Sequence, residues 1–288
     1  MRVDTRLILL LIGLTVSGCR DQPGRPGTPP NRISDSRQTT ASGPGTPILK
    51  KPKQAAHSST TQPPATLESA GYTVDDRMTA AMATVRVVNN ADITEGSGVI
   101  VAVRDQRLLV LTAAHIIAGA EAVDVLVYTA TTYPKPTRVL RDASVVANST
   151  TRDLALLRTS NTPTRVTPLA LCPPSELPRQ PSFWTMTIGC GNGKPPTPLL
   201  DHVDASLMVQ RPDAKRPVRL WQLQLAQSLG RSGGPMVDSR LRLLGIGSGA
   251  SGGHGYYCHL TEIDAFLRDH GFDNLIQPAA PADTTTPK

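Results

Sequence analysis

Three short segments of the chain carry side chains that acyl-transfer chemistry uses. They are Thr112-Ala113-Ala114-His115, Asp153-Leu154-Ala155-Leu156-Leu157 and Gly230-Arg231-Ser232-Gly233-Gly234-Pro235. A glycine turn around one serine exposes the hydroxyl and points successive backbone N–H groups into one concavity, as a nucleophile and an oxyanion hole require. A histidine can act as base for such a serine, and a half-buried carboxylate can accept the histidine Nδ1 proton.

Each segment has a simpler interpretation when it is considered alone. A histidine after an apolar strand is more often structural, and an aspartate such as Asp153 can simply belong to a turn. A glycine-rich turn such as the one around Ser232 can also bind phosphate. That interpretation is disfavoured here, because no lysine follows Ser232 and the next residues, 236–238, are typical of a strand rather than a helix.

Short strands must position these segments, because apolar and β-branched runs recur from residue 84 to residue 247. The predicted strands span 84–88, 98–103, 108–112, 123–129, 143–147 and 154–158, then 183–188, 202–210, 220–226, 235–238 and 241–247. A proline-rich connection at 166–181 separates the two sets. One helix is predicted at 261–270, with Thr261 as N-cap and Gly271 after its last turn. The pattern predicts an all-β fold of two small barrels with a short C-terminal helix.

Together, the TAAH, DLALL and GxSGGP segments resemble the chymotrypsin/trypsin-like serine protease family. The order His115, Asp153, Ser232 matches that family and differs from the subtilisin and α/β-hydrolase orders. Gly96-Ser97-Gly98 and Leu244-Gly245-Ile246-Gly247 are similar to elements of the bacterial HtrA/Deg-type branch. The resemblance covers residues 80–270, leaves no room for a PDZ domain, and implies two six-stranded antiparallel β-barrels at about 80–165 and 166–260.

The resemblance implies a role for each site residue. Ser232 would attack the scissile carbonyl, His115 would take its proton, and Asp153 would fix the histidine tautomer. The backbone N–H groups of Gly230 and Ser232 would form the oxyanion hole, and the reaction would need no metal or other cofactor. Arg231 stands where many secreted animal members carry an aspartate that pairs with a new N-terminus, so activation by propeptide removal is not expected.

The residues on either side of the serine turn are candidates for a substrate pocket. We expect one wall to come from Ala226 and Gln227, and the other from Gly247, Ser248 and Gly249. No acidic residue stands at either wall, so the sequence does not indicate a preference for arginine or lysine. It favours a small or aliphatic substrate side chain instead.

The N-terminus has the features of a secretory signal. Arg2 and Arg6 precede a short apolar run at 7–16, which is too short to span a bilayer. The segment Val16-Ser17-Gly18-Cys19 resembles the bacterial lipobox, which implies that residues 1–18 are removed and that Cys19 is acylated. Ordinary secretion with an incidental Cys19 is the alternative. We therefore predict an extracytoplasmic protein anchored to a bacterial membrane, in the periplasm or on the cell surface.

Residues 19–75 are rich in Pro, Gly, Ser and Thr and predict a disordered tether. The formal net charge is +7, but the signal and the tether hold more than half of it. The predicted protease domain, residues 76–272, is nearly balanced, so we predict no nucleic-acid partner. Residues 273–288 are expected to form a flexible tail. The composition, with 3% aromatic residues, excludes collagen, a coiled coil and a polytopic membrane protein.

Three cysteines remain after Cys19, and their spacing fits no zinc pattern. An oxidising compartment would permit a disulfide, but three thiols leave one unpaired, and the sequence does not choose among Cys172, Cys190 and Cys258. We interpret His254 and His259 as surface histidines rather than metal ligands.

These observations favour a membrane-tethered serine endopeptidase that cleaves proteins or peptides of the cell envelope or extracellular space. Two other hypotheses stay open. One is a catalytically silent protease-like domain that serves as a binding or chaperone module, and the other is an esterase on the same scaffold.

Overall fold

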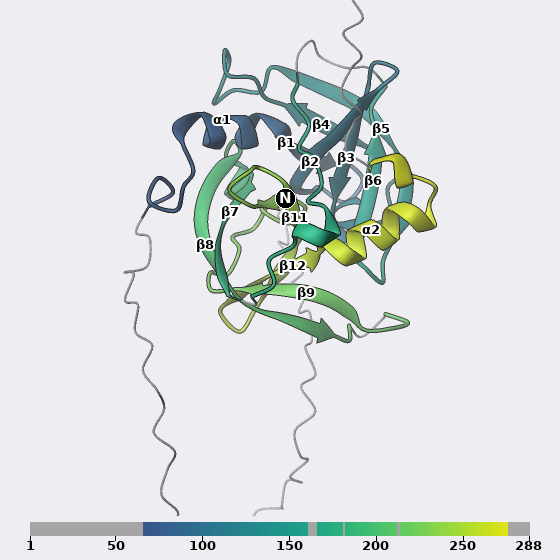
Figure 1. The fold of residues 1–288 in the computed structure, drawn as a ribbon. Helices are drawn as coiled ribbons and strands as arrows, with labels where there is room; N and C mark the ends of the chain where they lie inside the picture. The colour runs from purple at the N-terminus through teal and green to yellow at the C-terminus, as the bar shows by residue number, and fades with distance from the viewer. Residues whose placement is uncertain (1–65, 161–165, 181, 212–213, 276–288) are drawn as a thin grey trace, which may run out of the picture. The chain divides into compact units, whose positions relative to one another are not determined.

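Two closed antiparallel β-barrels of six strands each make up the chymotrypsin-like fold, as predicted (Figure 1). The computed structural model describes residues 66–160, 166–180, 182–211 and 214–275. The first barrel contains β1 (Thr84–Asn89), β2 (Thr94–Arg104), β3 (Arg107–Thr112), β4 (Ala122–Val127), β5 (Arg138–Ser149) and β6 (Leu154–Arg158). The second contains β7 (Phe183–Gly189), β8 (Thr197–Val209), β9 (Val218–Leu223), β10 (Pro235–Val237), β11 (Leu243–Ser251) and β12 (His254–His259).

Strands β3 and β6 are apolar on both faces, and each face has its own neighbours. Leu108 and Val110 of β3 belong to the core of the first barrel. Leu109 and Leu111 belong instead to a second cluster that extends through the other barrel. Side chains alternate between the two faces of a strand. The continuous apolar runs of β3 and β6 therefore reflect burial inside one barrel and against the other.

The pairing of β3 with β6 brings two of the predicted site residues to one edge. The strands are antiparallel, and Thr112 pairs with Ala155. His115 follows the end of β3, while Asp153 immediately precedes β6. Because the end of one antiparallel strand lies beside the start of its partner, the register places both residues at the same rim of the first barrel.

Two α-helices pack against the second barrel. Helix α1 (Val74–Ala83) begins with a capping box between Thr73 and Asp76, and its alanines are buried. Helix α2 (Leu260–Asp269) packs its apolar face against β9, β11 and β12 (Figure 1). Neither described helix has the length and apolar character needed to cross a bilayer.

The structure differs from the sequence-based expectations in four places. Helix α2 begins at Leu260, and its N-cap is His259 rather than Thr261, because the His259 side chain accepts from Thr261 N. Helix α1 was not expected, because alanines supply most of its apolar face. Strand β12 was not expected either, because its N-terminal residues follow a glycine turn and resemble a loop. The described fold also includes residues 66–75, which the sequence assigned to the tether. There, Tyr72 is buried, and its hydroxyl donates to Val237 O at 3.0 Å.

Candidate active site

His115 lies in the short 3₁₀ helix η1 (Ala114–Ile117) and faces Asp153. The imidazole Nδ1 lies 2.9 Å from Asp153 Oδ1 and 3.0 Å from Oδ2, and the backbone N–H of His115 donates to Oδ1 at 3.0 Å. A carboxylate on Nδ1 requires the proton on that nitrogen. The Nε2 atom is then the unprotonated one, which is the form a general base requires.

Asp153 is buried at the start of β6 and has a positive φ of 56°, a conformation that aspartate tolerates better than most residues. Burial by itself would raise the pKa of its carboxyl group. Hydrogen bonds from His115 and Ser248, together with the nearby charges of His115 and Arg211, outweigh burial and hold the pKa below its usual value. Asp153 is therefore ionised at neutral pH.

The turn that carries Ser232 is pressed against the first barrel. The backbone N–H of Ser97 donates to Ser232 O at 2.7 Å. Gly233 has a φ of +83°, and a Cβ at this position would lie 2.0 Å from Ser97 O and 2.5 Å from Thr112 Oγ1. Only glycine fits both the conformation and the close approach. The contact places Ser232 beside the end of β3, from which His115 follows.

Two backbone N–H groups of this turn differ from their neighbours in their hydrogen bonding. The N–H groups of Arg231, Gly233 and Gly234 donate to the backbone oxygens of Ser228, Gly247 and Arg231, respectively. Those of Gly230 and Ser232 donate to no protein oxygen among the described residues. Asn192 N donates to Leu229 O at 2.7 Å. That bond fixes the plane of the Leu229–Gly230 peptide and turns the Gly230 N–H to the opposite side.

Arg231 points away from the turn into the second barrel and is 4% exposed. Its guanidinium donates to Thr187 O and Thr197 O, each at 3.0 Å, and to Gly189 O at 3.4 Å and Thr187 Oγ1 at 3.2 Å. A planar guanidinium with five donors suits such a set of acceptors. Arg231 thus ties the serine turn to β7 and to the start of β8.

The two predicted walls of the substrate pocket approach each other through Gln227. Its side chain donates to Tyr256 O at 3.2 Å, and a Cβ at Gly247 would lie 2.8 Å from Gln227 Oε1. Gln227 therefore crosses from its own wall to the facing strands and fills space between them. Its Oε1 atom is buried without a hydrogen-bond partner in the described part of the chain. Ala226, in contrast, is exposed.

A shallow, partly open hollow lies next to the predicted wall at 247–249. It shares Ser248 and Gly249 with that wall, and it is lined by Val209, Arg211, Leu220, Ser248, Gly249, Ala250, Ser251 and Tyr256. The Ser248 hydroxyl donates to Asp153 Oδ2 at 2.5 Å, so it serves the carboxylate rather than the pocket.

Sequence reasoning missed two residues that contact Asp153 or the serine turn. Arg211 Nη1 lies 3.2 Å from Asp153 Oδ2, although no local pattern marks this arginine. Ser97 donates its hydroxyl to Gly230 O at 2.7 Å and accepts from Cys190 N at 2.8 Å. The GSG segment that contains Ser97 was noticed only as a resemblance.

The remaining predictions concern cysteines and histidines. Cys172, Cys190 and Cys258 are all buried free thiols, and burial raises the pKa of Cys190 to about 12. His259 is not the surface residue that was expected. It is 5% exposed and packs on Trp221 with the ring centroids 4.2 Å apart. Cys19 lies outside the described residues.

Comparisons with known proteins agree with this architecture. A family model described as a trypsin-like peptidase domain matches residues 96–246. The inactive form of the Rv3671c protease aligns with a TM-score of 0.54 and 22% identity over 67% of this chain and 90% of that one. The active form, from M. tuberculosis, gives a TM-score of 0.54 and 22% identity over 67% and 82%. No curated protein matches the sequence.

Proposed function

Because the chain belongs to the trypsin-like peptidase family, we propose that it is a serine endopeptidase with Ser232, His115 and Asp153 as its catalytic residues. One observation carries the proposal. The buried carboxylate of Asp153 accepts the Nδ1 proton of His115, at the rim of the first barrel against which the Ser232 turn is packed. A buried carboxylate that holds an imidazole in this tautomer is the part of the serine-protease triad that prepares the base for a neighbouring serine hydroxyl.

The geometry supports a two-step acyl transfer. His115 Nε2 takes the hydroxyl proton as Ser232 Oγ attacks the scissile carbonyl, and the imidazolium then returns the proton to the leaving amine. A water molecule, activated by the same imidazole, hydrolyses the acyl-enzyme. The N–H groups of Gly230 and Ser232, which have no protein acceptor in the described chain, would bind the oxyanion of each tetrahedral intermediate.

The substrate pocket supports a preference for a small or aliphatic side chain before the scissile bond. Gln227 fills part of the space between the two walls, which leaves less depth for a long side chain. Most of the residues lining the neighbouring hollow are apolar or small. Profiling with a peptide library tests this preference, and enrichment of arginine or lysine at the position before the cleaved bond would overturn it.

The N-terminal sequence supports attachment to a bacterial membrane through a lipid on Cys19, with proteins or peptides of the envelope or extracellular space as substrates. Several acyl chains would hold the protein firmly at a membrane surface. Replacing Cys19 by serine should release the protein into the soluble fraction and abolish incorporation of labelled palmitate. A Cys19→Ser variant that stays membrane-bound would contradict the anchor.

A fluorophosphonate probe tests the catalytic proposal without knowledge of the substrate. We expect the full chain to be labelled, and Ser232→Ala to lose all labelling. Ser228→Ala is a matched control, because this serine lies in the same turn and only its backbone oxygen holds the turn, by accepting from Arg231 N. Failure to label the folded chain would favour the silent binding module, and turnover of esters without peptides would favour the esterase.

A further inference from the structure

Arg211 contacts the carboxylate of Asp153 through Oδ2. Its Nη1 lies 3.2 Å from Asp153 Oδ2, and its Nη2 donates at 2.5 Å to Ser248 Oγ, which itself donates to the same carboxylate oxygen. The Arg211 side chain is 13% exposed, so solvent screens this ion pair only weakly. The Asp153 carboxylate is therefore shared between the imidazole, whose Nδ1 lies within 3.0 Å of both oxygens, and a guanidinium on Oδ2.

This sharing has a direct chemical consequence. During catalysis, the negative charge of Asp153 stabilises the imidazolium form of His115. A fixed cation beside the carboxylate keeps it ionised but opposes that stabilisation, because like charges repel across a few ångströms of low-dielectric interior. The buried Cys258 thiol of β12 also interacts with both Arg211 and Asp153, and Arg152 precedes Asp153 in the chain.

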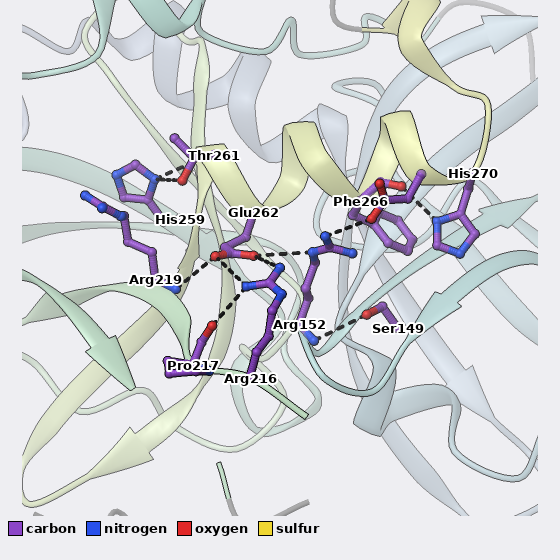
Figure 2. Close-up of polar contacts among 11 residues, drawn as sticks. Ser149, Arg152, Arg216, Pro217, Arg219, His259, Thr261, Glu262, Phe266 and His270 are labelled. Carbon is purple, nitrogen blue, oxygen red and sulfur yellow. Dashed lines mark hydrogen bonds and ion pairs between the residues drawn. The ribbon is translucent and has the colours of Figure 1, made fainter. Parts of the chain in front are cut away.

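A second carboxylate anchors the segment from which Arg211 comes. Glu262, in the first turn of α2, accepts from Arg216 Nη2 at 2.7 Å and from Arg219 N at 3.2 Å (Figure 2). Arg216 lies near the end of the connection that leads from β8 through Arg211 to β9, and Arg219 is the second residue of β9. The Glu262 side chain is 10% exposed. Its ion pair and hydrogen bonds outweigh burial and lower its pKa, so it stays ionised.

The same carboxylate also reaches the residue next to Asp153. Arg152 Nε donates to Glu262 Oε2 at 3.3 Å, and its Nη2 lies 2.8 Å from Asp269 Oδ2 at the other end of α2 (Figure 2). Glu262 therefore binds Arg152, which is next to Asp153 in the chain, and Arg216, which belongs to the same β8–β9 connection as Arg211.

Resting on the proposed peptidase function, we propose that Arg211 is a positioning residue that sets how strongly Asp153 favours the protonated form of His115, with Glu262 as its anchor. Arg211 touches neither the attacking serine nor the oxyanion amides. It acts through Asp153 by orienting Oδ2 and by neutralising part of its charge, which keeps the imidazole unprotonated, and thus available as a base, at lower pH.

An NMR titration of His115 tests this proposal without requiring turnover. The full chain is prepared as Ser232→Ala, and the imidazole signals of His115 are identified by their loss in His115→Gln. We expect Arg211→Gln to raise the titration midpoint of His115 by about one pH unit. Arg211→Lys, which keeps the positive charge, should leave the midpoint of His115 close to its value in the chain that has Arg211. Arg219→Gln removes an equal charge from β9 and should leave the midpoint in place.

Glu262→Gln tests the anchor. It should shift the midpoint in the same direction as Arg211→Gln, and the double variant should add little further, because both changes act through one contact. An unchanged midpoint in Arg211→Gln, or an equal shift in Arg219→Gln, would overturn the proposal. If Arg211→Gln fails to fold, Arg216→Gln replaces it, because this change removes the ion pair between the β8–β9 connection and Glu262. An unchanged His115 midpoint in Arg216→Gln would then overturn the proposal.

The rate of fluorophosphonate labelling provides a second measurement in the active chain. The labelling rate should fall at low pH as His115 becomes protonated. In Arg211→Gln this fall should occur at higher pH, by the same amount as the NMR midpoint of His115 is raised. A loss of rate at every pH without this shift in pH would mean that Arg211 is only structural. Absence of labelling in the wild-type chain would contradict the proposed function, whereas the NMR result would still decide the role of Arg211.

Discussion

Ser97 of the first barrel holds Ser232 of the second, because the Ser97 backbone N–H donates to the Ser232 carbonyl at 2.7 Å. The Ser97 hydroxyl bridges the same turn to β7 by donating to Gly230 O and accepting from Cys190 N. One residue of β2 thus positions both the nucleophile and a residue proposed for the oxyanion hole. The site is assembled across the two barrels rather than within either.

Ser97→Ala should therefore weaken the serine turn. The change leaves Cys190 N and Gly230 O without their partner, which costs about 1–3 kcal/mol of unfolding free energy. We also expect the fluorophosphonate labelling rate to fall about tenfold, as misplaced oxyanion donors typically cost at least that much. Urea denaturation and labelling kinetics measure the two effects. Ser144→Ala, at a half-buried serine of β5 whose hydroxyl donates to Arg158 O at 3.3 Å, is the control, and an equal loss there would contradict the prediction.

Arg231 should be required for folding of the serine turn. Arg231→Met removes the donors of three backbone carbonyls and one hydroxyl, and we expect a loss of about 3 kcal/mol or more, together with loss of labelling. Arg231→Lys keeps the charge but lacks the planar fork, so its loss should be smaller. Thermal unfolding of the two variants in the Ser232→Ala background measures the difference. Equal stabilities of wild type and Arg231→Met would contradict this assignment.

His259 should make the fold sensitive to mild acid. Burial, with a smaller effect of Arg219, lowers its pKa from 6.5 to about 4, and its Nδ1 caps α2 by accepting from Thr261 N at 3.1 Å. The unfolded chain binds this proton more readily, so stability is fully present above pH 6.5 and declines as the pH falls toward 4. We expect a loss of about 1–2 kcal/mol between pH 6.5 and pH 5.

Urea denaturation of the Ser232→Ala chain across this pH range measures the effect. His259→Asn keeps a capping side chain that does not titrate, so the decline between pH 6.5 and pH 5 should become shallower. The same slope in both chains would show that other groups cause the acid sensitivity.

Tyr72 should anchor the segment that precedes α1. Its buried hydroxyl donates to Val237 O and accepts from Met186 N at 3.1 Å. Tyr72→Phe leaves Met186 N unpaired and removes one of the two side-chain donors to Val237 O, the other being Thr185 Oγ1 at 2.8 Å, and it should cost about 1–3 kcal/mol. Tyr133→Phe, where the hydroxyl meets only Pro196 O, is expected to cost less. Unfolding curves of the two variants compare these losses directly, and equal losses would count against a special role for Tyr72.

The sequence predicted those parts of the fold that local patterns encode. The strand that ends before His115 and the strand that starts after Asp153 are uninterrupted apolar runs, so both were placed correctly. Strand β12 was not, because His254 and Gly255 look like a continuation of the glycine turn. Helix α1 carried a signal that was overlooked, since Thr73 and Asp76 have the spacing of a capping box.

The contacts around Asp153 could not be predicted in the same way. Arg211, in the connection after β8, and Ser248, in β11, reach the carboxylate from two separate parts of the second barrel, and their approach depends on how the barrels pack. Polar side chains such as His259 and Arg231 were also expected at the surface or left unplaced. Burial of each depends on partners that lie far away in sequence, Trp221 for the histidine and Thr187 for the arginine.

Strands β3 and β6 are buried on both faces, and this burial determines how the pair of His115 and Asp153 can be separated. Local opening requires a segment with few buried contacts, and these two strands have apolar neighbours on both faces. Their amide hydrogens should therefore exchange with solvent only when the whole domain unfolds. His115 and Asp153, at the ends of these strands, would stay together until then. Partial unfolding would therefore abolish activity by displacing the serine turn before it separated the histidine from its carboxylate.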